Sequence, residues 1–334
     1  MSTVTVLGAG GFLGSAVTRM LLDQQIRLKL IARRPLELPA DAAADVSVHV
    51  LDATDPDALA PVLLGSDVIL FMIRPSWDWR RADATELGEA VNVGPMRTII
   101  QTFAGRAETP LCVYAGSTGQ TGTPPEHPMD GTEIDMPNSD YERQKYQAER
   151  LMFTAHREGI LRAVSLRLCM VFGQQAGGGT DPGIVRLMGR RALAGNELTV
   201  WGDGTVTRDL LYVRDCAEAF RAVLDAPEGL LGRHWVVGSG EAWSLTRLFG
   251  KVAESVGRHT DKPPVPVVSV PPPEHAVSAD AHSVFVNPEA FQRVTGWRAR
   301  TSVEAGVDET VAVLASEFMD EATATEPAGA AEDR

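Results

Sequence analysis

Cysteine, positive charge and long apolar runs are all scarce in this sequence of 334 residues. The three cysteines, Cys112, Cys169 and Cys216, are odd in number, far apart and set in apolar stretches. That pattern predicts reduced, buried thiols rather than disulfides or a metal site. No apolar stretch approaches the ~20 residues that cross a bilayer, and no basic leader precedes the apolar run at Val4. We therefore expect a cytoplasmic protein with no membrane span and no bound metal.

The lack of positive charge limits the partners that the protein can have. Its formal net charge is −13, and no run rich in lysine or arginine offsets that charge locally. Such a chain repels nucleic-acid phosphates and anionic lipid surfaces, so neither is an expected partner. A hydrophobic content of 44% suffices for an ordinary globular core. An anionic ligand would have to be bound by a local cluster of arginines.

Short apolar runs alternate with amphipathic stretches over the first half of the chain. This alternation predicts an α/β fold, with a Rossmann-type doubly wound parallel sheet that binds ligands at the carboxyl ends of its strands. The expected strands are Val4–Leu7, Arg27–Ile31, Val46–Leu51, Val68–Ile73, Leu111–Ala115 and Ala163–Leu168, and the expected helices are Ser15–Leu22, Val91–Phe103 and Tyr141–His156. Further on we expect a helix over Gly183–Ala194, a strand over Leu198–Trp201 and a helix from about Val213. The small, polar and acidic C-terminus predicts a disordered tail over residues 319–334.

A glycine-rich turn follows the first expected strand and leads into a helix. Its glycines, Gly8, Gly11 and Gly14, have the spacing GxxGxxG, and together with Phe12 and Leu13 they form a candidate cofactor-binding loop directly before the helix. Glycines allow a tight turn there and let backbone amides approach a pyrophosphate at the positive helix N-terminus. A purely structural glycine turn would look similar, but the strand before it and the helix after it favour dinucleotide binding.

The ends of the second and third strands indicate which dinucleotide binds. An NAD site would place a carboxylate where Ala32 stands, to hold the ribose 2′-hydroxyl. Arg33 and Arg34 follow instead, and guanidinium groups pair with a 2′-phosphate, so we expect NADP(H) rather than NAD. The alternative is a solvated basic turn. Asp52, followed by Ala53, is placed to accept a hydrogen bond from the adenine amino group, although an ordinary strand-terminal aspartate would look the same.

Three residues form a candidate catalytic centre. Tyr141 and Lys145 are four apart, which places the phenol and the ammonium on one helix face. A nearby cation favours the phenolate, so Lys145 would make Tyr141 a usable general acid. Ser117 follows the strand Leu111–Ala115, where it can hydrogen-bond a substrate carbonyl oxygen. The spacing of Tyr141 and Lys145 alone is common by chance. A catalytic role is favoured because the glycine loop, the serine, the tyrosine and the lysine follow one another in this order.

In this order of motifs the chain resembles the extended short-chain dehydrogenase/reductase family up to about residue 315. The resemblance implies that Asn92 supports the catalytic geometry and that Phe71, Met72 and Ile73 line the cofactor cleft. It implies a nucleotide-binding domain over residues 1–170 and 209–238, and a smaller C-terminal substrate domain over 171–208 and 239–318. It also suggests a homodimer built by the helices Val91–Phe103 and Tyr141–His156.

The stretch Leu198–Val213 closely resembles the nucleotide-sugar motif of that family. By this resemblance Thr199 and Trp201 flank the nucleobase and Arg208 binds the diphosphate, which suits an aromatic ring and a guanidinium. The alternative is a core tryptophan and an arginine in a surface ion pair. Together with Arg190–Gly195, Pro273–Ala276 and Thr295–Arg298, the stretch resembles the dTDP-4-keto-6-deoxyhexose 4-ketoreductases of antibiotic deoxysugar pathways. His275 would then lie near the sugar or the diphosphate.

Departures from the family narrow the chemistry. Thr118 and Gly119 stand where a 4,6-dehydratase has an Asp-Glu pair, so dehydration is not expected. Gly119 also stands where a GDP-fucose synthase has a cysteine, so double epimerisation is not expected. Met170 replaces an asparagine that contacts the diphosphate in many members. We expect an NADPH-dependent reductase of a dTDP-4-keto-6-deoxysugar C4 ketone. The alternatives are an NAD-dependent nucleotide-sugar 4-epimerase and, from another class, a non-catalytic NADP-binding sensor or scaffold.

Overall fold

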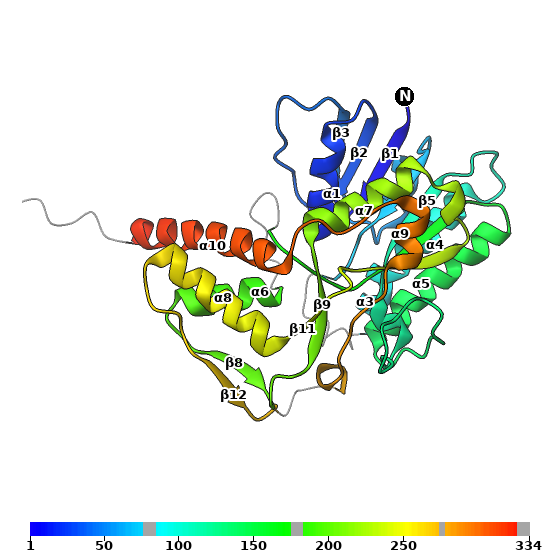
Figure 1. Ribbon diagram of the computed structural model, residues 1–334. Helices are drawn as coiled ribbons and strands as arrows, with labels where there is room; N and C mark the ends of the chain where they lie inside the picture. Colours follow the sequence, from blue (N-terminus) through cyan, green and yellow to red (C-terminus); the bar gives the residue numbers. More distant parts are fainter. Residues whose placement is uncertain (76–84, 175–182, 274–277, 326–334) are drawn as a thin grey trace, which may run out of the picture.

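The computed structural model describes residues 1–75, 85–174, 183–273 and 278–325. Within these residues seven strands form one parallel sheet (Figure 1). In spatial order they are β10 (Arg233–Val237), β6 (Arg162–Leu168), β5 (Leu111–Ser117), β4 (Val68–Phe71), β1 (Thr3–Leu7), β2 (Arg27–Ala32) and β3 (Asp45–Val50). The strand order reverses between β1 and β4, which is where such sheets bind ligands. The predicted doubly wound parallel sheet is confirmed.

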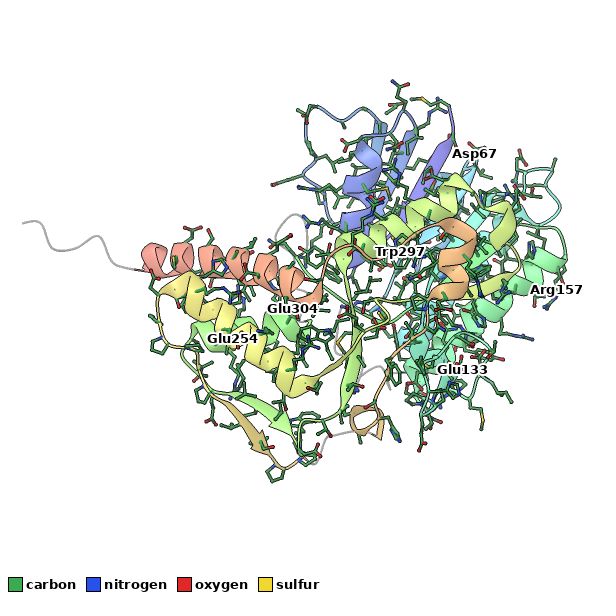
Figure 2. All side chains as sticks on the ribbon, in the orientation of Figure 1. Asp67, Glu133, Arg157, Glu254, Trp297 and Glu304 are labelled. Atoms are coloured by element: carbon green, nitrogen blue, oxygen red, sulfur yellow. The ribbon has the colours of Figure 1, made fainter. Side chains whose placement is uncertain are left out.

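Helices cover both faces of this sheet. On one face lie α1 (Phe12–Leu22), α7 (Val213–Asp225) and α9 (Glu289–Thr295), and on the other lie α2 (Pro56–Leu63), α4 (Gly94–Phe103) and α5 (Asp140–Arg157). Trp297, labelled in Figure 2, follows α9 and closes the first face: its ring packs against Phe291, and its Nε1 donates to the carbonyl of Asp215 at 3.0 Å. The three cysteines are buried and unpaired, as predicted, and burial raises the pKa of the Cys112 thiol to about 12.

One predicted helix is interrupted. In place of a helix over Val91–Phe103, α3 (Thr85–Asn92) ends at Asn92 and α4 begins at Gly94. Pro95 explains the break, because it has no N–H to donate to the preceding turn but fits the first turn of a new helix. Asn92 therefore lies at the end of one helix and not inside or at the start of the predicted one.

The remaining elements pack around a separate apolar core, at the lower left of Figure 1. They are β7 (Met170–Phe172), β8 (Leu198–Trp201), β9 (Thr207–Tyr212), β11 (Ala242–Ser244), β12 (Val267–Val270), α6 (Ile184–Leu193), α8 (Leu245–Thr260) and α10 (Val303–Thr325). Three short 3₁₀ turns connect described elements: η2 (Thr118–Thr121), η3 (Glu228–Leu230) and η4 (Ser278–Ala281). Strands β7, β9 and β11 form a small sheet, and β8 pairs with β12.

Helix α10 extends into the segment predicted to be a disordered tail. It continues to Thr325, so that prediction is wrong for residues 319–325, while residues 326–334 lie outside the described part of the chain. Ion pairs to α6 hold its distal turns: Arg186 contacts Glu317 at 2.7 Å, and Arg190 contacts Glu321 at 3.1 Å. No helix in the described part of the chain is both long and apolar enough to cross a membrane.

Candidate active site

The glycine loop lies between β1 and α1. Gly8 makes the turn with φ of +87°, a conformation that favours glycine. A Cβ on Gly14 would lie 2.0 Å from the carbonyl oxygen of Gly8, and one on Gly11 would lie 3.1 Å from it. No side chain caps α1, so the N–H groups of its first turn, at Phe12 and Leu13, are left for an anion at the positive helix end. The loop thus fits the pyrophosphate of a dinucleotide.

The end of β2 lies against this loop. A Cβ on Gly10 would lie 3.6 Å from the Cβ of Ala32, so Ala32 stands at the cofactor edge where a carboxylate would select NAD. Arg33 and Arg34 follow directly and are exposed. The geometry thus leaves two guanidinium groups, and no acidic side chain, on the turn that leaves β2.

Asp52 lies on the neighbouring turn after β3. Hydrogen bonds from the backbone and hydroxyl of Thr54, and in addition the charge of Arg33, lower the pKa of Asp52. Its carboxylate is exposed, whereas Ala53 is buried in the core beneath α2. Asp52 therefore remains a candidate contact of the cofactor, and the side chain of Ala53 serves packing.

The end of β4 meets the glycine loop through its backbone. The carbonyl oxygen of Met72 lies 3.1 Å from the position of a Cβ on Gly8, with the backbone of Ile73 next to it. Phe71 is fully buried, and its ring packs edge-on against Tyr114 with centroids 5.3 Å apart. The side chain of Phe71 therefore points into the core and lines no cleft, contrary to the prediction.

Ser117 ends β5 and caps the turn η2. Its Oγ accepts a hydrogen bond from the N–H of Gly119 at 3.1 Å, and its own N–H donates to Oε1 of Gln120 at 2.8 Å. A Cβ on Gly119 would lie 3.4 Å from Cγ of Glu142, so η2 lies against the first turn of α5. The accepted bond uses a lone pair, which leaves the hydroxyl proton to donate to a substrate oxygen.

Helix α5 brings Tyr141 and Lys145 to the same edge of the sheet. Ser139 caps this helix in a capping box with Glu142. Lys145 is 3% exposed, and its Nζ donates to the carbonyl oxygen of Ala115, near the end of β5, at 3.0 Å. Tyr141 stands one turn earlier and is partly exposed. The structure thus gathers the predicted serine, tyrosine and lysine at the carboxyl ends of the strands.

The ionisation of this pair differs from the expectation. Burial raises the pKa of Tyr141, where a lowered one was expected, and it lowers the pKa of Lys145 to about 7. Burial is the largest cause of both shifts, because it disfavours the charged form of each group. The charge of Arg74 lowers the pKa of both residues. Arg74 was missed in the sequence, although a cation directly after the run Val68–Ile73 was a readable signal.

The buried lysine predicts a specific dependence of stability on pH. Above pH 7 the folded state loses the Lys145 proton, while the unfolded state keeps it up to the ordinary pKa of 10.5. The free energy of unfolding should therefore rise by about 1.5 kcal/mol between pH 7 and 8.5 through this group. Urea unfolding of Lys145→Met should lack this rise, and the exposed Lys262→Met control should keep it. Equal pH slopes in all three proteins would contradict the prediction.

Asn92 ties α3 to the catalytic helix. It is fully buried, and its Nδ2 donates to Oε1 of Gln144, the neighbour of Lys145, at 2.8 Å. Its Oδ1 has no hydrogen-bond partner among the described residues. A buried acceptor of this kind is a place for a bound water. Asn92 thus bonds to α5 at the residue next to Lys145, and its support of the site stays a prediction.

The residues of the predicted nucleotide-sugar motif lie on β8 and β9. Thr199 and Trp201 are two apart on β8 and therefore face the same side. Arg208 is half-buried, its Nη1 donates to the carbonyl of His282 at 2.6 Å, and the charge of Asp280 acts on it as well. Met170 packs against the second core. His275 lies outside the described residues.

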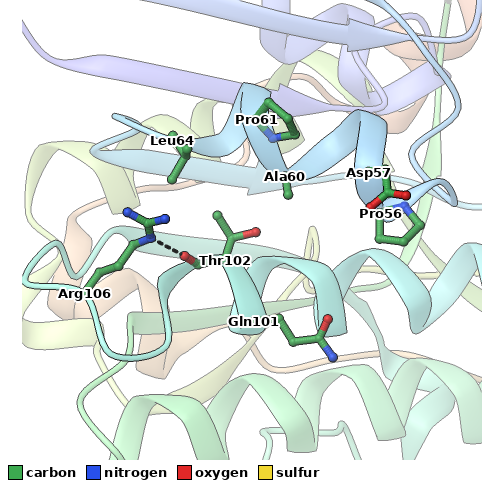
Figure 3. Close-up of a pocket in the computed structure, with 8 residues that line it drawn as sticks. All are labelled: Pro56, Asp57, Ala60, Pro61, Leu64, Gln101, Thr102 and Arg106. Atoms are coloured by element: carbon green, nitrogen blue, oxygen red, sulfur yellow. Dashed lines mark hydrogen bonds between the residues drawn. The ribbon is translucent and has the colours of Figure 1, made fainter.

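A pocket elsewhere carries none of these residues. It has a volume of about 330 Å³ and lies between α2 and α4 (Figure 3). Its lining comprises Pro56, Asp57, Ala60, Pro61, Leu64, Gln101, Thr102 and Arg106. Arg106 closes one end by donating from Nε to the carbonyl of Thr102 at 2.7 Å.

Comparison with known proteins identifies the family. Residues 4–238 match the model of the NAD dependent epimerase/dehydratase family. The chain belongs to this family. A UDP-glucose 4-epimerase of Mycolicibacterium smegmatis is 26% identical over 92% of this chain and 96% of its own. The solved structure of the UDP-glucose 4-epimerase of Thermotoga maritima with UDP-glucose aligns with a TM-score of 0.79 and 20% sequence identity. The alignment covers 96% of this chain and 99% of that chain. The solved structure of RMD from Pseudomonas aeruginosa with NADPH aligns with a TM-score of 0.74 and 19% sequence identity. The alignment covers 95% of this chain and 100% of that chain.

This membership confirms the predicted resemblance at the level of the family and the Rossmann-type fold. A nicotinamide cofactor is supported as well, since similar solved structures contain NAD or NADPH. The names of these relatives favour the alternative, a 4-epimerase, over the 4-ketoreductase subtype.

Proposed function

We propose that this protein reduces the C4 ketone of a dTDP-4-keto-6-deoxysugar with NADPH. Ser117, Tyr141 and Lys145 support carbonyl chemistry of this kind: Ser117 ends β5, Lys145 bonds to the carbonyl of Ala115 on that strand, and Tyr141 lies one helical turn before Lys145. The observation that carries the choice of reductase is the β2 end, where Ala32 faces the glycine loop and Arg33 and Arg34 follow it. An arginine pair without a carboxylate suits the 2′-phosphate of NADPH.

The protein's own residues would handle the carbonyl oxygen and its proton. The Ser117 hydroxyl donates a hydrogen bond to the substrate oxygen and orients it. Tyr141, kept protonated by its raised pKa, gives its proton to that oxygen as negative charge develops there. Lys145 stabilises the resulting phenolate and helps it to regain a proton. Bound NADPH, held by the glycine loop and the arginines, supplies the hydride that reduces C4.

A second candidate is a nucleotide-sugar 4-epimerase, which the relatives favour. It would use Ser117, Tyr141 and Lys145 for the same proton transfers, but would oxidise and re-reduce C4 within one turnover. Such an enzyme retains NAD and consumes no external reductant. Its difficulty in this chain is again Ala32, which cannot hold the ribose 2′-hydroxyl as a carboxylate does.

One assay separates the candidates. The purified protein is mixed with NADPH and a dTDP-4-keto-6-deoxyglucose, and the nicotinamide absorbance is followed. A reductase oxidises one NADPH for each sugar reduced. An epimerase releases NAD on denaturation and interconverts UDP-glucose and UDP-galactose with no change in absorbance. A protein that binds NADP(H) and does neither would be the non-catalytic sensor or scaffold. We also propose that the protein binds a dTDP-sugar as its substrate and that it forms a homodimer.

The cofactor choice gives a prediction that needs no substrate. Arg33→Ala/Arg34→Ala should raise the Kd for NADPH by about 10- to 100-fold, because charge-assisted hydrogen bonds to the 2′-phosphate are lost. The Kd for NADH should stay nearly unchanged. Calorimetric titration measures both constants, and Arg19→Ala, an exposed arginine on α1, is the control for loss of positive charge. An equal loss of affinity for both cofactors would argue against 2′-phosphate recognition.

A further inference from the structure

A buried cluster of charged side chains lies one helical turn beyond Lys145 on α5. Glu149 of this helix is 1% exposed, and Arg167 of β6 is 2% exposed. Nη2 of Arg167 donates to Oε1 of Glu149 at 2.5 Å, and its Nε donates to Oε2 at 3.2 Å. The hydroxyl of Ser165 donates to the same Oε2 at 2.6 Å. Both oxygens of the Glu149 carboxylate are therefore engaged from β6.

This engagement matters because Lys145 and Glu149 are four residues apart on one helix face. An ammonium and a carboxylate at that spacing ordinarily pair with each other. Among the described residues Lys145 nevertheless forms no ion pair with Glu149. Its Nζ donates instead to the carbonyl oxygens of Ala115, at 3.0 Å, and of Ile73, at 3.5 Å. These carbonyls belong to the sheet edge where the candidate active site lies.

Groups from each neighbouring element act on Lys145. From α5, the charge of Glu149 raises the pKa of Lys145; from the chain after β4, Arg74 lowers it, and burial lowers it most. From β5, the ring of Tyr114 lies 4.9 Å from Nζ. Glu149 is thus the anion that could draw the ammonium away from the sheet edge, and Arg167 donates hydrogen bonds to both oxygens of its carboxylate.

We propose that the Glu149–Arg167 pair is a positioning device for Lys145. Arg167 and Ser165 hold the Glu149 carboxylate on β6, so that the Lys145 ammonium stays at the carbonyl of Ala115 and is not drawn into an ion pair within its own helix. The catalytic part of this idea rests on the proposed function, whereas the position and protonation of Lys145 do not. The competing explanation is that the pair only anchors α5 to β6.

Asp135 provides the matched control. It accepts two hydrogen bonds from Arg167, from Nη1 to Oδ1 at 2.5 Å and from Nη2 to Oδ2 at 2.8 Å, and it makes none to Glu149. Asp135→Asn therefore weakens the cluster on the side away from Glu149. It should lower the melting temperature and leave the titration of Lys145 unchanged.

The test follows the protonation of Lys145 in the whole protein without cofactor or substrate. The chain has only four lysines, Lys29, Lys145, Lys251 and Lys262, so ε-¹³C-lysine labelling gives a spectrum that single substitutions assign. In Arg167→Met the released carboxylate should pair with Lys145 and raise its pKa by about one unit or more. Ser165→Ala, a smaller change that serves if Arg167→Met does not fold, should shift the pKa in the same direction by less.

The proposal would be overturned if either variant melted at a lower temperature while Lys145 titrated as in the wild type. The pair would then have only an anchoring role. An upward shift that the additional substitution Glu149→Gln reverses would support it. Because the titration requires no turnover, it decides the positioning role even if neither reductase nor epimerase activity is found.

Discussion

Replacing Tyr141 with phenylalanine is expected to lower kcat by about 10²- to 10⁴-fold, the usual contribution of a positioned general acid. The variant loses the proton that neutralises the substrate oxygen but keeps an aromatic ring at this position of α5. The Kd for the cofactor and the melting temperature should therefore stay close to those of the wild type. Steady-state kinetics with NADPH and the keto-sugar measure the effect, and calorimetry measures cofactor binding.

The control for Tyr141 is its neighbour on the same helix. Tyr146→Phe removes a phenol hydroxyl from a residue that is no part of the proposed centre and should leave kcat within about twofold, as for surface changes away from special contacts. Full activity of Tyr141→Phe would remove Tyr141 from the mechanism, whereas a wild type without activity would revive the non-catalytic alternative. A loss of cofactor binding together with activity would instead assign a structural role.

Replacing Gly14 with alanine is expected to disrupt the cofactor loop. The new Cβ would lie 2.0 Å from the carbonyl oxygen of Gly8 and 2.7 Å from its carbonyl carbon, and neither backbone atom can move without breaking the turn. Overpacking of this severity should cost about 3 kcal/mol of stability, at the upper end of its ordinary range. The displaced turn should also weaken cofactor binding by more than about tenfold, as urea unfolding and calorimetric titration would show.

Gly250 is the matched control, because it also lies in a helix and a Cβ there would meet no atom within 4 Å. Gly250→Ala should be neutral or stabilise the protein by up to about 1 kcal/mol, since alanine is the better helix former. Wild-type stability and affinity in Gly14→Ala would show that the loop can widen and that close backbone approach is not required at Gly14.

The local pattern of the sequence predicted the elements that hold the cofactor and the catalytic centre. The periodicity around Val4–Leu7 and Leu111–Ala115 revealed strands of the central sheet, and the glycine spacing predicted the turn that a Cβ on Gly14 would block. These features are local, because they depend on neighbours within a few residues. The break between α3 and α4 was also readable, from Pro95, although the apolar pattern alone suggested one continuous helix.

Other features could not be predicted because they depend on residues far apart in the sequence. The extension of α10 to Thr325 depends on arginines of α6 that lie more than a hundred residues earlier. The Glu149–Arg167 pair joins α5 to β6 across 18 residues of sequence. The inward direction of Phe71 depends on the register of β4 against β5. Each of these needs the packed sheet, because strand pairing decides which side chains become neighbours.

By itself, the sequence determined the family, the order of the cofactor loop and Ser117, and the spacing of Tyr141 and Lys145 on one helix face. Only the tertiary structure decided how these two residues ionise. Burial at the sheet edge raises the pKa of Tyr141 and lowers that of Lys145 to about 7, the reverse of what an exposed tyrosine–lysine pair would do. The physical reason is that removal of water disfavours charge on both groups, and the amount of water removed is a property of the fold.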